Sequence, residues 1–192
     1  MSGKPRSDAI PAELVLVRAF VNTLDVEDAL DEIASPAALG AWCRAHAGLA
    51  ADQLVSRRDL AAAIEVRDVL RRVLLAHSGF AIPAEEHAEL NRRLERYQAG
   101  IGFDAAGQPH VHARGSGVTH VLAQLLIDVA TAQATGTWSR CKLCPAEDCL
   151  WAFYDHSKNR SRRWCSMDVC GNRTKTKSYR RRRRLTAGAN DG

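Results

Sequence analysis

Apolar residues recur every three or four positions through most of the first 135 residues, which is the spacing of amphipathic helices. The first such segment begins at Pro11, and its apolar positions are Leu14, Val17, Val21 and Leu24. Because residues 14–20 are apolar apart from one arginine, a short buried strand is an alternative there. The polar pair Asn22-Thr23 interrupts the segment, and Thr23 or Asp25 is expected to cap a short helix that continues to Ile33.

Two further helices have clear signals at their first residues. In the pair Ser35-Pro36, serine suits the N-cap and proline the first helical position, so a helix is expected from here to Gly48. Ser56 and Asp59 resemble a capping box in which aspartate replaces glutamate. They begin the longest amphipathic segment, which continues to about His77.

The second half of this region predicts two more helices with a non-helical segment between them. The helices are expected over residues 83–100 and 117–136, each ending at a glycine. Residues 101–114 contain glycine, proline and the alternation Pro-His-Val-His, which is typical of a short hairpin or loop with exposed histidines. Residues 11–136 are therefore predicted to form a mainly helical domain.

Charge is distributed unevenly along the 192 residues. Residues 1–139 carry thirteen Lys and Arg against seventeen Asp and Glu, whereas residues 140–192 carry fourteen against five. An acidic body with a basic end is typical of proteins that contact a polyanion through one end. No apolar run reaches the roughly 20 residues of a membrane span, and the first residues lack a signal-peptide core. We expect a cytoplasmic protein without membrane contact, with flexible ends at residues 1–10 and 186–192.

Five of the six cysteines lie within residues 141–170, which favours metal ligands over disulfides in a cytoplasmic chain. Tetrahedral zinc needs four ligands, so two sets compete. Cys144 and Cys149 can join the pair Cys165 and Cys170, or Cys141 can replace Cys149, and spacing alone leaves both open. Strand-like residues 151–154 and 162–164 could pair as a hairpin that brings Cys149 and Cys165 together, which favours the first set.

Residues 162–173, R-R-W-C-S-M-D-V-C-G-N-R, resemble the signature of the CGNR zinc-finger family, whose name stands here at residues 170–173. Two further marks of that family are the segment C-P-A-E-D-C at residues 144–149 and F-Y-D at residues 153–155. The resemblance implies one structural Zn²⁺ and leaves Cys141 as an extra thiol. The implied ligands are Cys144, Cys149, Cys165 and Cys170. Residues 14–135 are similar to the helical domain that such proteins carry, described as a putative stress-induced transcription regulator.

The sequence after Cys170 predicts a basic helix that begins at the second cysteine pair, so residues 137–185 are expected to form a zinc finger with a β-hairpin and this helix. We expect it to contact DNA mainly at phosphates, as part of a transcriptional regulator. The predicted contact residues are Arg162, Arg163, Arg173, Lys175, Lys177, Arg180, Arg181 and Arg184.

Three other classes of function compete with DNA binding. Aromatic residues beside the basic helix could stack on bases, so an RNA-binding or ribosome-associated protein is the main alternative. An adaptor that meets an acidic partner is another. A zinc enzyme is disfavoured because four thiolates close the metal site and the chain has no H-E-x-x-H motif.

The helical body of such a regulator could sense a small-molecule effector. Asn22, Thr23 and Arg67 are candidate ligand-binding residues, although a cap at Asn22-Thr23 and an exposed Arg67 are the plainer interpretation. A homodimer is also expected, because one small finger rarely gives sharp sequence specificity.

Overall fold

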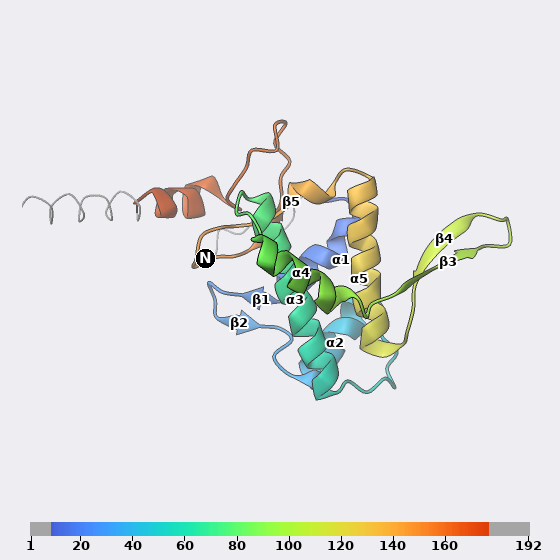
Figure 1. Ribbon diagram of the computed structural model, residues 1–192. Coiled ribbons are helices and arrows are strands. Elements are labelled where there is room, and N and C mark those ends of the chain that lie inside the picture. The colour runs from blue at the N-terminus through green and yellow to red at the C-terminus, as the bar shows by residue number, and fades with distance from the viewer. Residues whose placement is uncertain (1–8, 177–192) are drawn as a thin grey trace, which may run out of the picture.

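The structure is a computed structural model that describes residues 9–176, and it is mainly helical (Figure 1). Three helices form the centre of the body: α1 (Ala12–Val21), α3 (Arg57–His77) and α5 (Gly117–Ala134). Each contacts the other two, and α2 (Pro36–Ala47) packs against α3 and α5. Their apolar faces meet in one core, whose fully buried members include Leu14, Phe20, Leu39, Val66, Leu74 and Leu122.

The predicted start signals of α2 and α3 are confirmed. The Ser35 hydroxyl accepts the Ala38 N–H at 3.1 Å, and α2 ends at Gly48, which has a φ of 66°. Ser56 and Asp59 form a reciprocal capping box, in which each side chain accepts the backbone N–H of the other residue. The two longest elements of the first half of the chain are thus fixed by local hydrogen bonds.

The segment after α1 does not form the predicted second helix. It folds instead into a small antiparallel hairpin of β1 (Leu24–Asp25) and β2 (Leu30–Asp31). The Asp25 carboxylate accepts the N–H groups of Glu27 and Asp28 at 3.0 and 3.2 Å. The prediction was wrong because this short acidic side chain satisfies backbone donors within a turn, in competition with a helix.

The predicted hairpin between the last two helices of the body is confirmed. The helix α4 (Ala84–Leu94) is shorter than predicted, and Gly100, expected as its end, lies in a strand. The strands β3 (Ala99–Phe103) and β4 (Pro109–Ala113) pair antiparallel, and their ribbon projects away from the helices beside α5 (Figure 1).

The C-terminal part begins with a third hairpin. A short 3₁₀ turn, Trp138–Arg140, leads into β5 (Cys141–Leu143), which pairs with β6 (Ala152–Tyr154) and packs on α3. Residues 162–164 do not pair with β6, so the predicted hairpin between the two cysteine pairs is wrong. Leu143 and Ala152 belong to the core of the helical body, so this hairpin is shared between the body and the finger.

The described chain ends in a helix that follows the last cysteine pair. A π-helical turn, Met167–Gly171, continues as an α-helical turn over residues 172–176. No helix between residues 9 and 176 is long and apolar enough to cross a bilayer.

Candidate metal centre

Four cysteine side chains converge at one buried point. The Sγ atoms of Cys144, Cys149, Cys165 and Cys170 all lie within 4.8 Å of one another. The sulfurs of Cys149 and Cys165 are 3.5 Å apart, and those of Cys165 and Cys170 are 3.7 Å apart. Four sulfurs at about 2.3 Å from a tetrahedral zinc ion lie about 3.8 Å from one another. The cluster therefore has the dimensions of one zinc site.

The first two sulfurs are placed by a tight turn between β5 and β6. Cys144 follows β5 directly, and its N–H donates to the Trp151 carbonyl at 2.9 Å. The N–H groups of Cys149 and Leu150 both donate to the Ala146 carbonyl, at 2.9 and 3.1 Å, and Leu150 has a φ of 50°. These bonds close the turn and bring the two thiols together.

The second two sulfurs lie at the start of the last described helix. Cys165 precedes Ser166, whose side chain caps the helix by accepting the Val169 N–H at 3.3 Å. Cys170 lies one turn into the helix, and its sulfur accepts a hydrogen bond from Arg173 at 3.5 Å. A helix N-terminus and a guanidinium both stabilise thiolate charge, so this end of the cluster suits a metal-bound sulfur.

Cys144, Cys149 and Cys165 influence one another's ionisation. Hydrogen bonds from Cys149 and Cys165 lower the pKa of Cys144, whereas contacts with Cys144 raise the pKa of Cys149 and of Cys165. One thiolate is favoured and each further negative charge is opposed by the first. A divalent cation removes this repulsion, and four buried sulfurs are the donors of a closed structural zinc site. The residues present therefore fit one structural Zn²⁺.

A buried ion pair between Lys142 and Asp155 supports the loop that leads to the second pair of cysteines. The Lys142 Nζ lies 2.7 Å from Asp155 Oδ2, and it also donates to the carbonyls of Arg160 and Arg162 at 2.6 and 3.0 Å. Asp155 accepts the N–H groups of Ser157 and Arg162, both at 2.9 Å. Burial would raise the pKa of Asp155, but the bonds from Lys142 and Ser157 lower it.

This network explains why residues 155–164 form a loop rather than a strand. Backbone groups that a strand would direct to β6 bind the side chains of Lys142 and Asp155 instead. Sequence reasoning missed Lys142, whose only signal was a lysine in a run of residues that otherwise reads as a buried strand. A buried cation needs a buried anion, and Asp155 is that partner.

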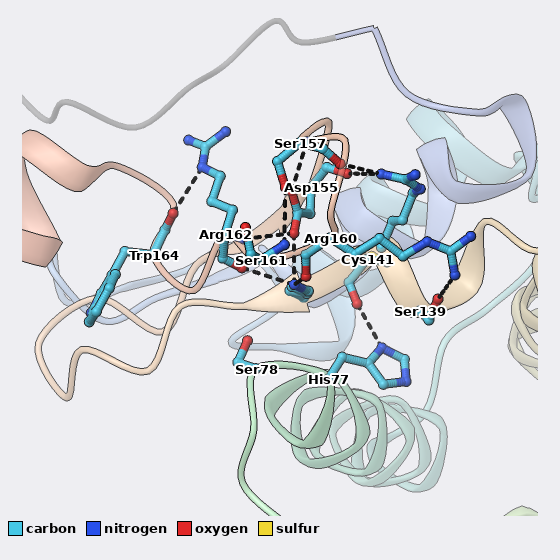
Figure 2. A network of polar contacts seen from close by, with 12 residues as sticks. His77, Ser78, Ser139, Cys141, Asp155, Ser157, Arg160, Ser161, Arg162 and Trp164 are labelled. Carbon is cyan, nitrogen blue, oxygen red and sulfur yellow. Dashed lines mark hydrogen bonds and ion pairs between the residues drawn. The ribbon is translucent and has the colours of Figure 1, made fainter.

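Cys141 lies apart from the four-sulfur cluster. Its side chain is 1% exposed and packs in the core of the body, and burial raises the pKa of its thiol to about 12. Its backbone carbonyl accepts a hydrogen bond from His77 Nδ1 at 2.8 Å (Figure 2). Cys141 is thus a core residue and not a free surface thiol.

The body holds the finger through hydrogen bonds to both strands of the β5–β6 hairpin. The Asn22 side chain bonds the N–H and the carbonyl of Ala152, at 2.7 and 3.0 Å. On the other strand, the Ser78 hydroxyl donates to the Leu143 carbonyl at 2.6 Å. Because Asn22 ends α1 and Ser78 ends α3, the ends of two core helices set the position of the hairpin.

Two of the arginines predicted to contact nucleic acid have partners within the protein. Arg162 donates to the carbonyls of Trp164 and Cys165, and its guanidinium lies over the Phe153 ring at 5.2 Å. Besides its hydrogen bond to the Cys170 sulfur, Arg173 forms two ion pairs, with Asp148 at 3.5 Å and with Glu27 at 3.4 Å. Both side chains therefore support the finger, whatever else they contact.

The remaining predicted contact residues divide into exposed and undescribed positions. Arg163 and Lys175 are exposed on the finger. Four others lie outside the described residues: Lys177, Arg180, Arg181 and Arg184. Contact of all eight residues with nucleic acid stays a prediction.

The three candidate ligand-binding residues also have internal partners. Arg67 is 3% exposed; its guanidinium forms two bonds with the Asp31 carboxylate, at 2.7 and 2.8 Å, and one with the Thr23 hydroxyl at 3.0 Å. It is therefore not the exposed side chain of the plainer interpretation. Asn22 binds β6, as described, but it also lines a hollow of about 490 Å³ together with Trp42 and Trp151. Ligand binding by these residues stays a prediction.

The helical body, the closed four-cysteine cluster and the shared hairpin define a zinc-finger protein. Residues 14–136 match the model of the ABATE family, described as a putative stress-induced transcription regulator, and residues 140–183 match that of the CGNR zinc finger. The chain belongs to the ABATE family and carries a CGNR zinc finger after the helical domain. No curated protein matches the sequence.

Proposed function

We propose that this protein is a DNA-binding transcription regulator in which the zinc finger contacts the phosphate backbone. The observation that carries the proposal is the position of the last described helix. Its first turn is anchored in the cysteine cluster, and the sequence that follows it, residues 177–184, contains five consecutive arginines. The metal holds the beginning of a basic segment while the helical body stays acidic.

The basic residues of the finger fall into two groups, those that bond within the protein and those that are exposed to solvent. Arg162 and Arg173 are committed to internal hydrogen bonds, whereas Arg163 and Lys175 are exposed and available to a phosphate, although the Arg163 guanidinium also lies over the Trp164 ring at 5.7 Å. Phosphate contacts from such side chains would give affinity without much sequence information. Specificity would then need base contacts or a second copy of the finger.

A salt titration with the zinc-loaded full chain and labelled duplex DNA tests this proposal. If about six phosphates are neutralised, the log–log plot of affinity against salt concentration should have a slope of about −5. A slope near zero, or no binding at low salt, would contradict it. Selection of bound sequences from random duplex DNA would then establish whether one motif is preferred.

Competition between duplex DNA and single-stranded RNA for the protein tests the alternative function, RNA binding. Phe153, one of the aromatic residues that could stack on bases, is 2% exposed and lies under Arg162, so it has no free face for a base. We therefore expect unlabelled duplex DNA to displace the labelled duplex better than single-stranded RNA does. The reverse order would favour the RNA-binding function.

The helical body would control the finger through the hollow beside Asn22. That hollow is lined by Trp42 of the body and Trp151 of the finger, so a ligand there would touch both parts. An effector that binds it would change the position of β6 through the Asn22–Ala152 bonds. A screen of small molecules for a rise in melting temperature, repeated with Trp42→Ala, tests this; a rise that survives the substitution would place the ligand elsewhere.

A further inference from the structure

The β3–β4 ribbon has one face that is entirely apolar and largely exposed to solvent. In the antiparallel register, Ile101 pairs with Val111 and Phe103 pairs with Pro109. Ile101 is 74% exposed, Phe103 71% and Val111 54%. Since side chains alternate across a ribbon, the face consists of Ala99, Ile101, Phe103, Pro109, Val111 and Ala113. A two-stranded ribbon that exposes such a face to water is marginally stable by itself.

The opposite face of the ribbon is already filled by its own side chains. There, Gly100 pairs with His112 and Gly102 pairs with His110. A Cβ atom at Gly100 would lie 2.6 Å from the His112 ring, and one at Gly102 would lie 2.8 Å from the His110 ring. The imidazoles thus lie over the glycines, and the apolar face is left as the surface for a partner.

The helix α5 offers a matching apolar surface at the base of the ribbon. Its inner face packs in the core through residues such as Leu122 and Leu125. A second stripe at helical spacing lines a groove of about 360 Å³ together with residues 97–99 and Val111. The stripe consists of Ala123, Leu126, Ile127, Ala130, Thr131 and Ala134. A helix with two apolar faces has more such surface than its own core uses.

We propose that a second copy of this chain covers both surfaces, with the ribbon of each copy lying in the α5 groove of the other. The lengths agree: five strand residues span about 17 Å, and the α5 stripe from residue 123 to 134 spans about 16 Å. Each chain carries one ribbon and one groove, so a two-fold axis satisfies both at once. The proposal goes beyond DNA binding and does not depend on it.

Charge and area both favour a second copy as the occupant. Among the described residues that line the groove, Tyr97 is the one with a titratable side chain, so two copies meet there without like-charge repulsion. The three large apolar residues exposed on the ribbon offer on the order of 400 Å² per copy, about half of what one partner contributes to a standard interface, and the groove supplies more. The chain's own undescribed segments, 1–8 and 177–192, are polar or basic and do not match an apolar groove.

Sedimentation velocity on the zinc-loaded full chain, treated with nuclease and run in high salt, tests the proposal. At about 10 µM we expect a species of twice the 21.0 kDa chain mass. The double substitution Ile101→Ser and Phe103→Ser should weaken association at least about 100-fold. Both side chains are exposed in one copy, so the variant and the wild type should melt at the same temperature when both are dilute enough to be monomeric, and the wild type alone should melt higher as its concentration rises. A wild-type chain that stays monomeric at about 100 µM would overturn the proposal.

Variants in the groove separate this geometry from other contacts. Ala130→Glu, in the groove, should dissociate the dimer, whereas Gln133→Glu on the exposed part of the same helix should not. Leu54→Ser, at a residue that is 95% exposed elsewhere, is the matched control for loss of a surface apolar side chain. A dimer that survives Ala130→Glu, or one that Leu54→Ser dissociates, would contradict the assignment.

Cross-linking locates the contact. With the photo-reactive amino acid benzoylphenylalanine in place of Phe103, links between a labelled and an unlabelled copy should reach residues 123–134 of the other copy. Links that join ribbon to ribbon, or that form within one copy only, would contradict the groove as the binding surface.

Discussion

The side-chain amide of Asn22 bonds both backbone groups of Ala152, a residue 130 positions further along the chain. A neighbouring strand would make the same pair of bonds, so Asn22 acts as one residue of a strand at the open edge of β6. This contact joins the C-terminal end of α1 to the hairpin that precedes the metal cluster.

Removal of the Asn22 amide should loosen the finger from the body. Asn22→Ala leaves the buried N–H and carbonyl of Ala152 without partners, which should lower the free energy of unfolding by about 2 to 4 kcal/mol. Thermal unfolding followed by circular dichroism measures this. Asn91→Ala, at an exposed asparagine of α4, is the control and should change stability by less than about 0.5 kcal/mol.

Whether a cysteine-to-serine substitution abolishes zinc binding should depend on whether that cysteine lies in the four-sulfur cluster. Cys149→Ser removes one of four sulfurs within the cluster, so we expect loss of bound zinc and of the folded finger. Cys141→Ser should keep one zinc per chain, because that sulfur lies in the core of the body with a pKa raised to about 12 by burial. The zinc content of each variant is measured by mass spectrometry. Loss of zinc in Cys141→Ser would mean that the proposed set of four ligands is wrong.

The Lys142–Asp155 pair should show strong coupling. Lys142→Met leaves the Asp155 carboxylate buried without its main partner, which should cost about 3 to 5 kcal/mol of finger stability. Asp155→Asn combined with Lys142→Met should recover part of this loss, because no uncompensated charge remains. Lys158→Met, in the same loop but exposed, should have little effect. Additive effects of the two single substitutions in urea unfolding would show that the pair is not coupled.

His77 should make stability depend on pH. Burial lowers its pKa from the ordinary value of 6.5, so the unfolded imidazole takes up a proton before the folded one does. The stability that His77 contributes is complete above its unfolded pKa and is lost as the pH falls through its lower folded value. We expect His77→Asn, which keeps a donor near Nδ1, to reduce the fall in urea midpoint between about pH 7.5 and about pH 5.5. His87→Asn, on the exposed side of α4, should leave that fall unchanged.

Arginines of the finger should separate into structural and exposed classes. Arg173→Ala removes a bond to the Cys170 sulfur and two ion pairs, so both zinc affinity and melting temperature should fall. Arg163→Ala should leave both unchanged and, if the finger contacts phosphate, reduce the salt slope of DNA binding by about one. Equal effects of the two substitutions on melting temperature would contradict this division.

The sequence predicted those helices and hairpins whose ends are determined by hydrogen bonds between residues close together in the chain. The caps at Ser35 and Ser56 and the hairpin at residues 101–114 were predictable because each depends on residues a few positions apart. The four sulfurs were predictable from spacing together with the family pattern. The hairpin of β5 and β6 was not, because its position depends on Asn22 and Lys142, whose partners lie far away in sequence or in a loop without periodicity.

Leu143 and Cys144 are neighbours in sequence, yet Leu143 is buried among the helices of the body and Cys144 belongs to the metal cluster. One peptide bond therefore separates two environments that are usually parts of different domains. Metal starvation would withdraw support from the hairpin and, through it, from the α3 surface beneath. Loss of zinc would in this way lower the resistance of the whole polypeptide to proteolysis, not only that of the finger.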